Sequence, residues 1–418
     1  MIFKLFISNF ALATLLIATE LPIGFTQEEW NNRHLILNMG RETEPPEGPV
    51  RSIAEYEPMQ GVLIRYPFGI NTSLIKEISS DEIVYCLVSS SLQNAAFNTM
   101  NNAQVNMDNV EFIIGPTDSY WTRDYGPWWA VDANGDAVII DFTYNRPRIN
   151  DNQAPLKVSS HLDVPYYSAD FISTGGNYMT DGYGASASSH IAYTENDECL
   201  TNDDSSVPLS PCNYVDEKML NYYGVSNYHV IADPNNDYID HIDCWAKFLS
   251  SSKILIRQVP LNHPQYDEIE QIVNYFAENT SYEIIRVNTP NNEPYTNSLI
   301  LNNKVFIPVM NSINDSDAIE VYESALPGYE ILPFTGTWES TDALHCRIKG
   351  IPDLSFFSIN PGDLNIDNII NILDIVLCVN FVLGEEIPTS VQFNNADMNS
   401  DETLNVLDVI LIVNEVIE

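Results

Sequence analysis

An alternation of short strand-like runs with helical stretches constrains the fold of this chain, and it extends from about Val50 to Ile351. The strand-like runs are GVLIRY, EIVYCLV, VEFIIG, AVIIDF, KILIRQV, YEIIRV and SLILNNKVFIPV, and one helical stretch is HPQYDEIEQIVNYFAEN. This alternation is typical of an α/β fold. In the last run, Asn302 and Asn303 suit the tight turn of a hairpin. We therefore expect mixed sheets rather than purely parallel ones.

The charge balance indicates which ligands the chain can bind. Its 418 residues, 44% of them hydrophobic, are enough for one large domain with a full core plus something small. The 18 Lys and Arg residues face 58 Asp and Glu residues, which gives a formal charge of -40. Such a chain repels nucleic acid and anionic lipid. Cationic ligands are the better expectation: arginine side chains, amines or metal ions.

The N-terminus, MIFKLFISNFALATLLIA, places Lys4 ahead of an apolar run from Leu5 to Ala18. This order matches the charged and hydrophobic regions of a secretory signal peptide. We expect a signal over residues 1–25 and a mature protein that is secreted or attached to the cell surface. An uncleaved anchor is the alternative, although the run is shorter than a bilayer span needs. No later stretch is long enough to span a membrane.

The cysteines indicate neither a zinc site nor a disulfide scaffold. They are Cys86, Cys199, Cys212, Cys244, Cys346 and Cys378. Cys199 and Cys212 bracket the polar segment LTNDDSSVPLSP and could close a surface loop in an oxidising compartment, or remain as thiols. The others are expected to be single thiols.

A second module follows Pro352, where the composition changes and no Lys or Arg comes after Lys349. GDLNIDNIINILDIVLCVNFVLG is repeated as ADMNSDETLNVLDVILIVNEVIE, with equivalent residues 34 positions apart, as from Asp363 to Asp397. Each copy reads as an acidic loop followed by an amphipathic helix. Residues 360–418 are therefore expected to form a separate module, with the boundary near residues 360 and 361.

Oxygen-bearing side chains in both copies occupy positions 1, 3, 5, 9 and 12 of a calcium loop. They are Asp363, Asn365, Asp367, Asn371 and Asp374 in the first copy, and Asp397, Asn399, Asp401, Asn405 and Asp408 in the second. The carbonyl of Ile369 or Thr403 would supply position 7, so each loop could hold Ca²⁺ with oxygen ligands. The alternative is a pair of acid-capped helices.

This module resembles a type I dockerin, which carries two calcium loop–helix repeats and binds a cohesin domain. The resemblance implies attachment to a cohesin-type partner or to the cell surface. Position 6, usually glycine in such loops, is Asn368 in the first copy and Glu402 in the second, which alters the loop turn.

Four segments of the large domain concentrate functional side chains: YWTRDYGPWW, STGGNYMTDGYG, YIDHIDCWAKF and TDALHCRIKG. Cys346 follows the loop TGTWESTD at a place where a thiolate could be exposed and act as a nucleophile, although a lone cysteine is more often a small buried hydrophobe. His241 and Asp243 would share one face of an extended segment; the alternative is a surface histidine. Aromatic neighbours would bury Asp124, either as a functional carboxylate or in a pair with Arg123.

A cysteine, a histidine and two carboxylates form the set that hydrolysis of a guanidinium group needs. Each carboxylate can accept two N–H bonds from the planar cation and fix its central carbon in front of the thiolate. The histidine can protonate the leaving ammonia and then deprotonate the water that clears the covalent intermediate. We expect no metal or organic cofactor in catalysis.

These segments resemble the guanidine-modifying penteins, specifically the bacterial peptidylarginine deiminase and agmatine deiminase family. The matching motifs are W-x-R-D-x-G-P at Trp121–Pro127, G-G-N at Gly175–Asn177, H-x-D at His241–Asp243, and H-C at His345-Cys346. The resemblance covers Val50 to Ile351 and implies a pentein catalytic domain over residues 45–355. The implied fold is a five-bladed α/β propeller of ββαβ units, followed here by the calcium loop–helix module.

The same resemblance implies residue roles. Cys346 would be the nucleophile, His241 the general acid and base, and Asp124 and Asp243 the guanidinium clamps. Trp121 would lie along the aliphatic stem of the substrate.

The choice of guanidine depends on YNRPRIND, whose Arg146 and Arg148 could present two cations to a carboxylate from one extended face. The alternative is a solvated turn with an Arg-Asp pair. The segment is similar to the one with which secreted bacterial peptidylarginine deiminases hold the carboxylate of a C-terminal arginine. EYEPMQGVLIRYP and YTNSLI, with Asn297 as a substrate-binding residue, also resemble that branch.

Agmatine deiminases typically carry a glutamate where this chain has Thr174, and glycines where it has Thr341 and Asp342. We therefore expect peptidyl or free arginine to be converted to citrulline and ammonia. Agmatine, giving N-carbamoylputrescine, is the alternative substrate. Two rival functions remain open: an inactive module that binds arginine peptides and displays them through its dockerin-like domain, and an amidinotransferase that resolves the same intermediate with an amine.

Overall fold

The computed structural model describes residues 20–199, 201–235, 238–357, 361–365, 369–388, 390–399, 401 and 403–417. Most of the expected signal peptide, residues 1–19, lies outside the described residues. So do Asp367, Asn368 and Glu402 of the calcium loops. None of the helices within these ranges is long and apolar enough to cross a membrane.

The strands of the described residues form five small sheets. Two sheets have four strands: in order of pairing, one consists of β17 (Lys349–Pro352), β2 (Met59–Arg65), β3 (Ile83–Val88) and β4 (Val110–Ile114), and the other of β1 (Arg51–Ser52), β5 (Trp128–Val131), β6 (Ala137–Tyr144) and β7 (Tyr166–Ser173). The other three sheets have three strands. The first consists of β10 (Asn227–Ile231), β9 (Ala185–Ser189) and β8 (Met179–Thr180), the second of β11 (Ala246–Ser250), β12 (Lys253–Gln258) and β13 (Glu283–Asn288), and the third of β14 (Leu299–Leu301), β15 (Lys304–Val309) and β16 (Glu330–Thr335).

Each sheet combines an antiparallel pair with a parallel pair. The parallel strands β12 and β13 are joined through a helix, as are β15 and β16. The mixed sheets and the α/β class expected from the sequence are therefore confirmed. The number of sheets equals the number of blades that the family resemblance implies.

The α-helices connect the strands or lie beyond them. They are α1 (Gln27–Asn31), α2 (Thr72–Ile78), α3 (Gln93–Asn102), α4 (Thr122–Tyr125), α5 (Ile149–Asn152), α6 (Ala154–Leu162), α7 (Ile191–Thr194), α8 (Asn213–Tyr223), α9 (Tyr266–Asn279), α10 (Asp315–Ala325), α11 (Ile372–Leu383), α12 (Ser390–Ala396) and α13 (Val406–Ile417). Short 3-10 turns are η1 (Arg33–Asn38), η2 (Met107–Asn109), η3 (Gly175–Asn177), η4 (Asp197–Cys199), η5 (Ile242–Cys244) and η6 (His345–Arg347).

Local sequence explains these elements. In α9, Ile269, Ile272 and Phe276 recur at helical spacing and are the buried positions of the helix. The expected hairpin joins β14 to β15, where Leu301 pairs with Lys304 and Asn302 adopts a left-handed φ of 52°. Asparagine tolerates this conformation better than most residues.

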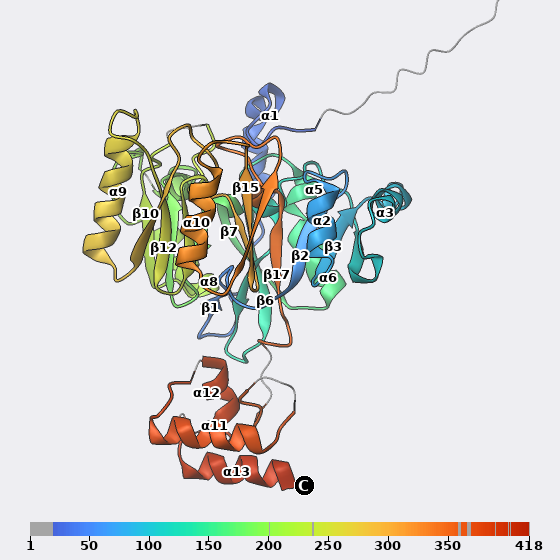
Figure 1. Cartoon of the computed structure of the whole chain (residues 1–418), viewed down its shortest axis with the longest axis vertical. Coiled ribbons are helices and arrows are strands. Elements are labelled where there is room, and N and C mark those ends of the chain that lie inside the picture. Colours follow the sequence, from blue (N-terminus) through green and yellow to red (C-terminus); the bar gives the residue numbers. More distant parts are fainter. Residues whose placement is uncertain are drawn as a thin grey trace, which may run out of the picture.

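The hydrophobic cores reflect the two modules. One large cluster joins the sheets of the larger module, and a smaller one packs α10 against β14 and β15. The C-terminal helices bury a separate cluster of their own, which includes Leu364, Cys378, Phe381 and Ile412. Figure 1 shows α11, α12 and α13 together at one end of the molecule, with α1 near the other end. The structure also bonds Cys199 to Cys212, one of the two states that the sequence left open.

Candidate active site

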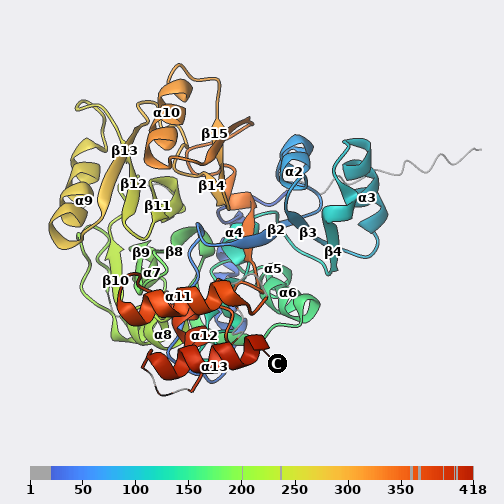
Figure 2. The ribbon, with the colours of Figure 1, turned by 60° about the horizontal axis from the view of Figure 1, so that its bottom comes forward.

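The four motifs meet at short turns in the middle of the sheets. Figure 2 shows α4 near the centre, with strands of the different sheets around it. α4 contacts η3 and η6, and η3 contacts η5. A Cβ atom on Gly176 would lie 2.5 Å from Nδ1 of His241 and 2.6 Å from Oδ1 of Asp124. The G-G-N motif is therefore required for close approach of the chain to these two side chains.

Cys346 lies on η6 and is completely buried, at 0% exposure. Its Sγ accepts a hydrogen bond from Nδ2 of Asn297 at 3.2 Å and lies 3.9 Å from Oδ2 of Asp243. Oδ1 of Asn297 accepts the main-chain N–H of His345 at 3.0 Å and that of Cys346 at 3.4 Å. These side-chain hydrogen bonds of Asn297 go to the turn η6 that carries Cys346, whereas the sequence assigned this residue to the substrate.

A chain of hydrogen bonds runs from Asp243 to Glu55. Nδ1 of His345 lies 2.7 Å from Oδ2 of Asp243, and Nε2 of His345 lies 2.6 Å from Oε2 of Glu55. Glu55 also accepts hydrogen bonds from Nη2 of Arg123 at 2.7 Å and from Nζ of Lys247 at 2.8 Å. Sequence reasoning missed Glu55 and the part played by His345. Glu55 stands at the start of the quoted EYEP segment, but its partners are far away in sequence.

Asp124 and His241 form the other half of the site, and each is 1% exposed. Oδ1 of Asp124 lies 3.6 Å from Nδ1 of His241. Oδ1 of Asp124 and both ring nitrogens of His241 are buried and have no hydrogen-bond partner in the described part of the chain. Buried polar atoms are normally paired, so this cluster suits a polar ligand.

The electrostatics of the site follow from burial. Burial, and after it the charge of Asp243, raises the pKa of Asp124 well above its ordinary value. Burial lowers the pKa of His241 to about 4; Asp243 opposes that shift and Arg146 adds to it. Burial, with Asp243 and Asp124 next, raises the pKa of the Cys346 thiol well above its usual range. In the free site the thiol and the imidazole are therefore neutral at pH 7.

Asp243 differs from Asp124 because it is already partnered. Burial would raise the pKa of Asp243, but the hydrogen bond and positive charge of His345 outweigh it, and the pKa falls below the ordinary value. Glu55 behaves alike: burial opposes ionisation, but the charges of His345, Lys247 and Arg123 hold its pKa well below the usual range.

Two expectations about local geometry were wrong. His241 has extended backbone, with φ −90° and ψ 135°, but Asp243 lies on the 3-10 turn η5, so the H-x-D segment is not an extended strand. Arg148 is the N-cap residue of α5 and shares no extended face with Arg146. Both arginines are buried, as is His241, which rules out the solvated turn and the surface histidine.

Trp121 packs in a cation–aromatic cluster. Its ring centroid lies 4.3 Å from that of Tyr120 and 5.4 Å from Cζ of Arg347. Arg347 is in turn held by Asp342 through bonds of 2.8 and 2.6 Å. Asp342, which the sequence used only to argue against agmatine, thus fixes a neighbour of Trp121; burial raises its pKa to about 6.

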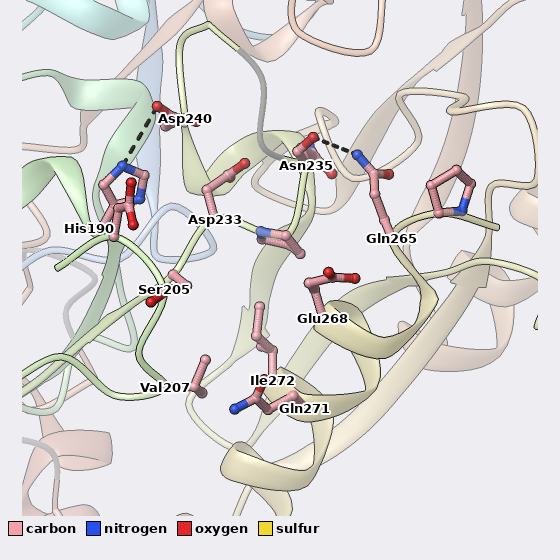
Figure 3. Close-up of a pocket in the computed structure, with 14 residues that line it drawn as sticks. His190, Ser205, Val207, Asp233, Asn235, Asp240, Gln265, Glu268, Gln271 and Ile272 are labelled. Atoms are coloured by element: carbon pink, nitrogen blue, oxygen red, sulfur yellow. Dashed lines mark hydrogen bonds and ion pairs between the residues drawn. The ribbon is translucent and has the colours of Figure 1, made fainter.

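A separate acidic pocket of about 540 Å³ lies beside this site. Figure 3 shows His190 and Asp240 on one side of it and Asn235 with Gln265 on the other. Nε2 of His190 lies 3.7 Å from Oδ2 of Asp240, the residue before His241. None of the predicted catalytic side chains lines this pocket.

The described residues that the sequence assigned to calcium loops lie before and at the starts of α11 and α13. Asp374 accepts hydrogen bonds from the N–H groups of Leu364 and Asn365, and Asp408 accepts those of Met398 and Asn405. Oδ1 of Asn371 and Oδ1 of Asn405 cap the two helices. The N–H of Asp401 donates to Oδ1 of Asp397 and to Oδ1 of Asn399, so these two side-chain oxygens meet at one N–H of the same loop. Hard oxygen donors of this kind fit Ca²⁺.

Comparison with known proteins agrees with this geometry. The family model of the Porphyromonas-type peptidyl-arginine deiminase matches residues 52–352, and that of the type I dockerin domain matches residues 361–417. A Vibrio parahaemolyticus protein named "Putative agmatine deiminase" is 24% identical over 363 residues, which cover 72% of this chain and 96% of that protein.

Solved structures show the same fold. The agmatine deiminase of C. jejuni matches with a TM-score of 0.59 and 19% identity, over 73% of this chain and 96% of that one. The agmatine deiminase of Enterococcus faecalis matches with a TM-score of 0.59 and 17% identity, over 80% of this chain and 99% of that one. The chain therefore belongs to the Porphyromonas-type peptidyl-arginine deiminase family, a family of guanidino-group hydrolases with the pentein fold, and carries a type I dockerin domain at its C-terminus.

Proposed function

We propose that the catalytic domain hydrolyses the guanidinium group of arginine at the C-terminal end of a peptide, giving citrulline and ammonia. The observation that carries this proposal is the set of buried, unpartnered polar atoms on Asp124 and His241 beside a buried cysteine. A planar cation with several N–H donors would satisfy the carboxylate that has no cation of its own.

Asp124 and Asp243 would clamp the guanidinium. Both carboxylates contribute to raising the pKa of the Cys346 thiol. When a guanidinium cation binds between them, its positive charge offsets theirs and favours the thiolate. The proton that Cys346 loses goes to His241, which is neutral in the free site because burial lowers its pKa to about 4.

The reaction then proceeds in two halves. The Cys346 thiolate forms a bond to the central guanidinium carbon and gives a tetrahedral adduct. His241 donates its proton to the departing nitrogen, the carbon–nitrogen bond breaks and ammonia leaves. His241 next removes a proton from water, and the hydroxide adds to the same carbon. The carbon–sulfur bond then breaks, the hydroxyl proton passes to the departing sulfur, and the ureido product and the free Cys346 thiol are released. Asn297 holds the nucleophile turn through this sequence.

The guanidinium groups of Arg146 and Arg148 would select the substrate. Both side chains are buried, and Nη1 of Arg148 has no hydrogen-bond partner in the described residues. Two guanidinium groups are suited to a peptide carboxylate, which agmatine lacks. Agmatine is the second candidate substrate, since the similar proteins above are named agmatine deiminases.

Ammonia release from matched substrates tests the proposal. The substrates are a peptide ending in arginine, the same peptide with a C-terminal amide, a peptide with internal arginine, and agmatine. We expect turnover of the first to exceed that of the amide by about a hundredfold, since charge-assisted bonds contribute about 1.5–3 kcal/mol each. Turnover of agmatine alone would refute the carboxylate assignment. Consumption of arginine only when an amine acceptor is added, with a new guanidine formed on that amine and no citrulline, would indicate an amidinotransferase.

Cys346→Ala tests the nucleophile. We expect it to abolish ammonia release while the circular dichroism spectrum stays unchanged. Cys86→Ala is the matched control because Cys86 is also a buried free thiol, on β3. If Cys346→Ala keeps more than a few per cent of the wild-type rate, Cys346 is not the nucleophile.

We further propose that the protein is secreted or attached to the cell surface, that its C-terminal loops bind Ca²⁺, and that the dockerin domain binds a cohesin-type partner. The type I dockerin match and the oxygen-rich loops support this. Calcium has no part in the hydrolysis.

A further inference from the structure

The segment of residues 20–25, here called the N-terminal strap, is bound by the side chains proposed to bind substrate. Nε of Arg146 donates to the carbonyl of Ile23 at 3.1 Å. Nη2 of Arg148 donates to the carbonyls of Pro22 at 2.7 Å and Gly24 at 2.9 Å. Nε1 of Trp121 donates to the carbonyl of Leu21 at 3.3 Å. Three side chains of the site thus hold four consecutive carbonyls of one peptide.

The side chains of the strap and of the helix after it strengthen this contact. Ile23 is 2% exposed and belongs to the main hydrophobic core. The ring of Phe25 lies 4.3 Å from Cζ of Arg146. In α1, Glu29 pairs with Nε of Arg148 at 2.6 Å and with its Nη2 at 3.2 Å. Glu20 pairs with Arg65. The strap is therefore docked by apolar, ionic and main-chain contacts together.

We infer that Trp121, Arg146 and Arg148 form a binding site for a peptide main chain, and that the N-terminal strap fills it as an internal inhibitor. This inference rests on the proposed function and adds its regulation. Residues 20–32 contain no Arg or Lys, so the strap brings no guanidinium to Asp124. It occupies the place of a substrate without being one.

The site next to the residues that bind the strap is closed. Cys346, His241 and Asp124 are all buried, and Trp121, which bonds to the strap, belongs to the same motif as Asp124. A Cβ atom on Gly24 would lie 2.8 Å from the ring of Tyr238, whose segment leads to His241, so the strap lies against that segment as well. A substrate must displace the strap before its arginine reaches the thiol.

The chemistry of the contacts favours displacement by a carboxylate. The strap offers Arg146 neutral carbonyls only, whereas a peptide C-terminus offers a charged acceptor, and charge-assisted hydrogen bonds are about twice as strong as neutral ones. Nη1 of Arg148 is buried without an acceptor in the described residues and could take one oxygen of that carboxylate. A peptide ending in arginine would therefore both open the site and react in it.

Loosening the strap in the full chain tests the inference. One variant is Glu29→Gln, a second adds Ile23→Asp, and Glu28→Gln is the matched control because Glu28 is exposed in the same helical turn. The readouts are alkylation of Cys346 by iodoacetamide, located by peptide mapping, and kcat/KM for a peptide ending in arginine. Alkylation is compared at one pH, where it reports access to the thiol, and it needs no substrate.

We expect both rates to rise about tenfold or more in the double variant, because the fraction of open sites limits both, and to stay within about twofold in the control. A synthetic peptide of residues 20–32 should return both rates toward the wild-type values. Unchanged alkylation in both strap variants would overturn the inference. The inference requires that a signal peptide ends before Glu20, so mass spectra showing that the secreted protein begins after Phe25, the end of the signal expected from the sequence, would also overturn it. Faster alkylation of the strap variants, without hydrolysis of any guanidine, would support the strap as a cover of the thiol and would refute the proposed function.

Discussion

Substitution of Asp124 by asparagine should separate activity from stability. The carboxylate is 1% exposed, and its Oδ1 has no hydrogen-bond partner in the described residues. Burial and the charge of Asp243 raise its pKa well above the ordinary value. In the free enzyme, ionisation of Asp124 therefore costs free energy. A bound guanidinium would offset this cost.

For activity, the variant leaves a buried guanidinium facing a neutral amide. Removing one partner of a buried ion pair costs about 3–5 kcal/mol, and each 1.4 kcal/mol or so is a factor of ten. We expect kcat/KM for ammonia release to fall by between about a hundredfold and a few thousandfold.

We expect the same substitution to raise the unfolding free energy, although it lowers activity. A carboxyl whose pKa is raised in the folded state destabilises the fold as pH rises above its unfolded pKa of about 3.9. Asp124→Asn removes this penalty, so its unfolding free energy in urea should match the wild type near pH 4 and exceed it by about 1 kcal/mol at pH 7. Asp181→Asn is the control: that buried carboxylate accepts hydrogen bonds from Tyr183, Ala185 and Tyr282, and its loss should destabilise by about 1–3 kcal/mol.

The two effects together test the reasoning. If Asp124→Asn loses stability at pH 7 as Asp181→Asn does, Asp124 is a structural residue and the clamp is wrong. If its kcat/KM falls by less than tenfold, Asp124 does not bind the reacting group.

Three further predictions concern the thiol, the disulfide and the C-terminal loops. Because burial and two carboxylates raise the pKa of Cys346, its alkylation in the ligand-free enzyme should climb through pH 9 without levelling off; a plateau near pH 8 would contradict the raised pKa. Reducing the bond between Cys199 and Cys212, whose sequence separation is 13, should lower the unfolding free energy by about 3 kcal/mol in urea titrations. Asp397→Ala with Asp401→Ala should remove one of two calcium-binding events in calorimetry of the full chain and leave ammonia release unchanged; two retained events would refute the loop assignment.

Patterns with local causes could be predicted from the sequence. The strand–helix alternation, the Asn302–Asn303 hairpin and the helix of residues 266–279 depend on neighbours in sequence, and the structure shows all three. The C-terminal repeat was readable for the same reason. The sequence also indicated that the four motifs belong together, because so many functional side chains are rarely concentrated in four short segments. The elements that carry the motifs are in contact.

Features with distant partners could not be predicted. Glu55 bonds to residues 68 and 290 positions away, and nothing in its neighbourhood marks it as buried. The turn at His241 was missed because a histidine and an aspartate two residues apart suit a strand and a 3-10 turn equally. The sequence places residues 20–25 within the expected signal peptide, and their contacts with Arg146 and Arg148 could not be predicted because they span more than 120 residues.

The chain has few cations, which explains why Asp124, one of the two carboxylates of the proposed clamp, has no cationic partner of its own. Glu55 pairs with Arg123 and Lys247, and Asp243 shares a hydrogen bond with His345, so both of these carboxylates have partners within the chain. Arg146 and Arg148 lie close enough to lower the pKa of Asp124, but both donate hydrogen bonds to the strap. Arg146 also donates to the carbonyl of Asn145, and Arg148 pairs with Glu29. Under the proposed function, the positive charge that Asp124 lacks comes from the substrate. A substrate that joins a cation and a carboxylate in one molecule would satisfy Asp124 and the arginine pair at once, and neither agmatine nor the strap can do both.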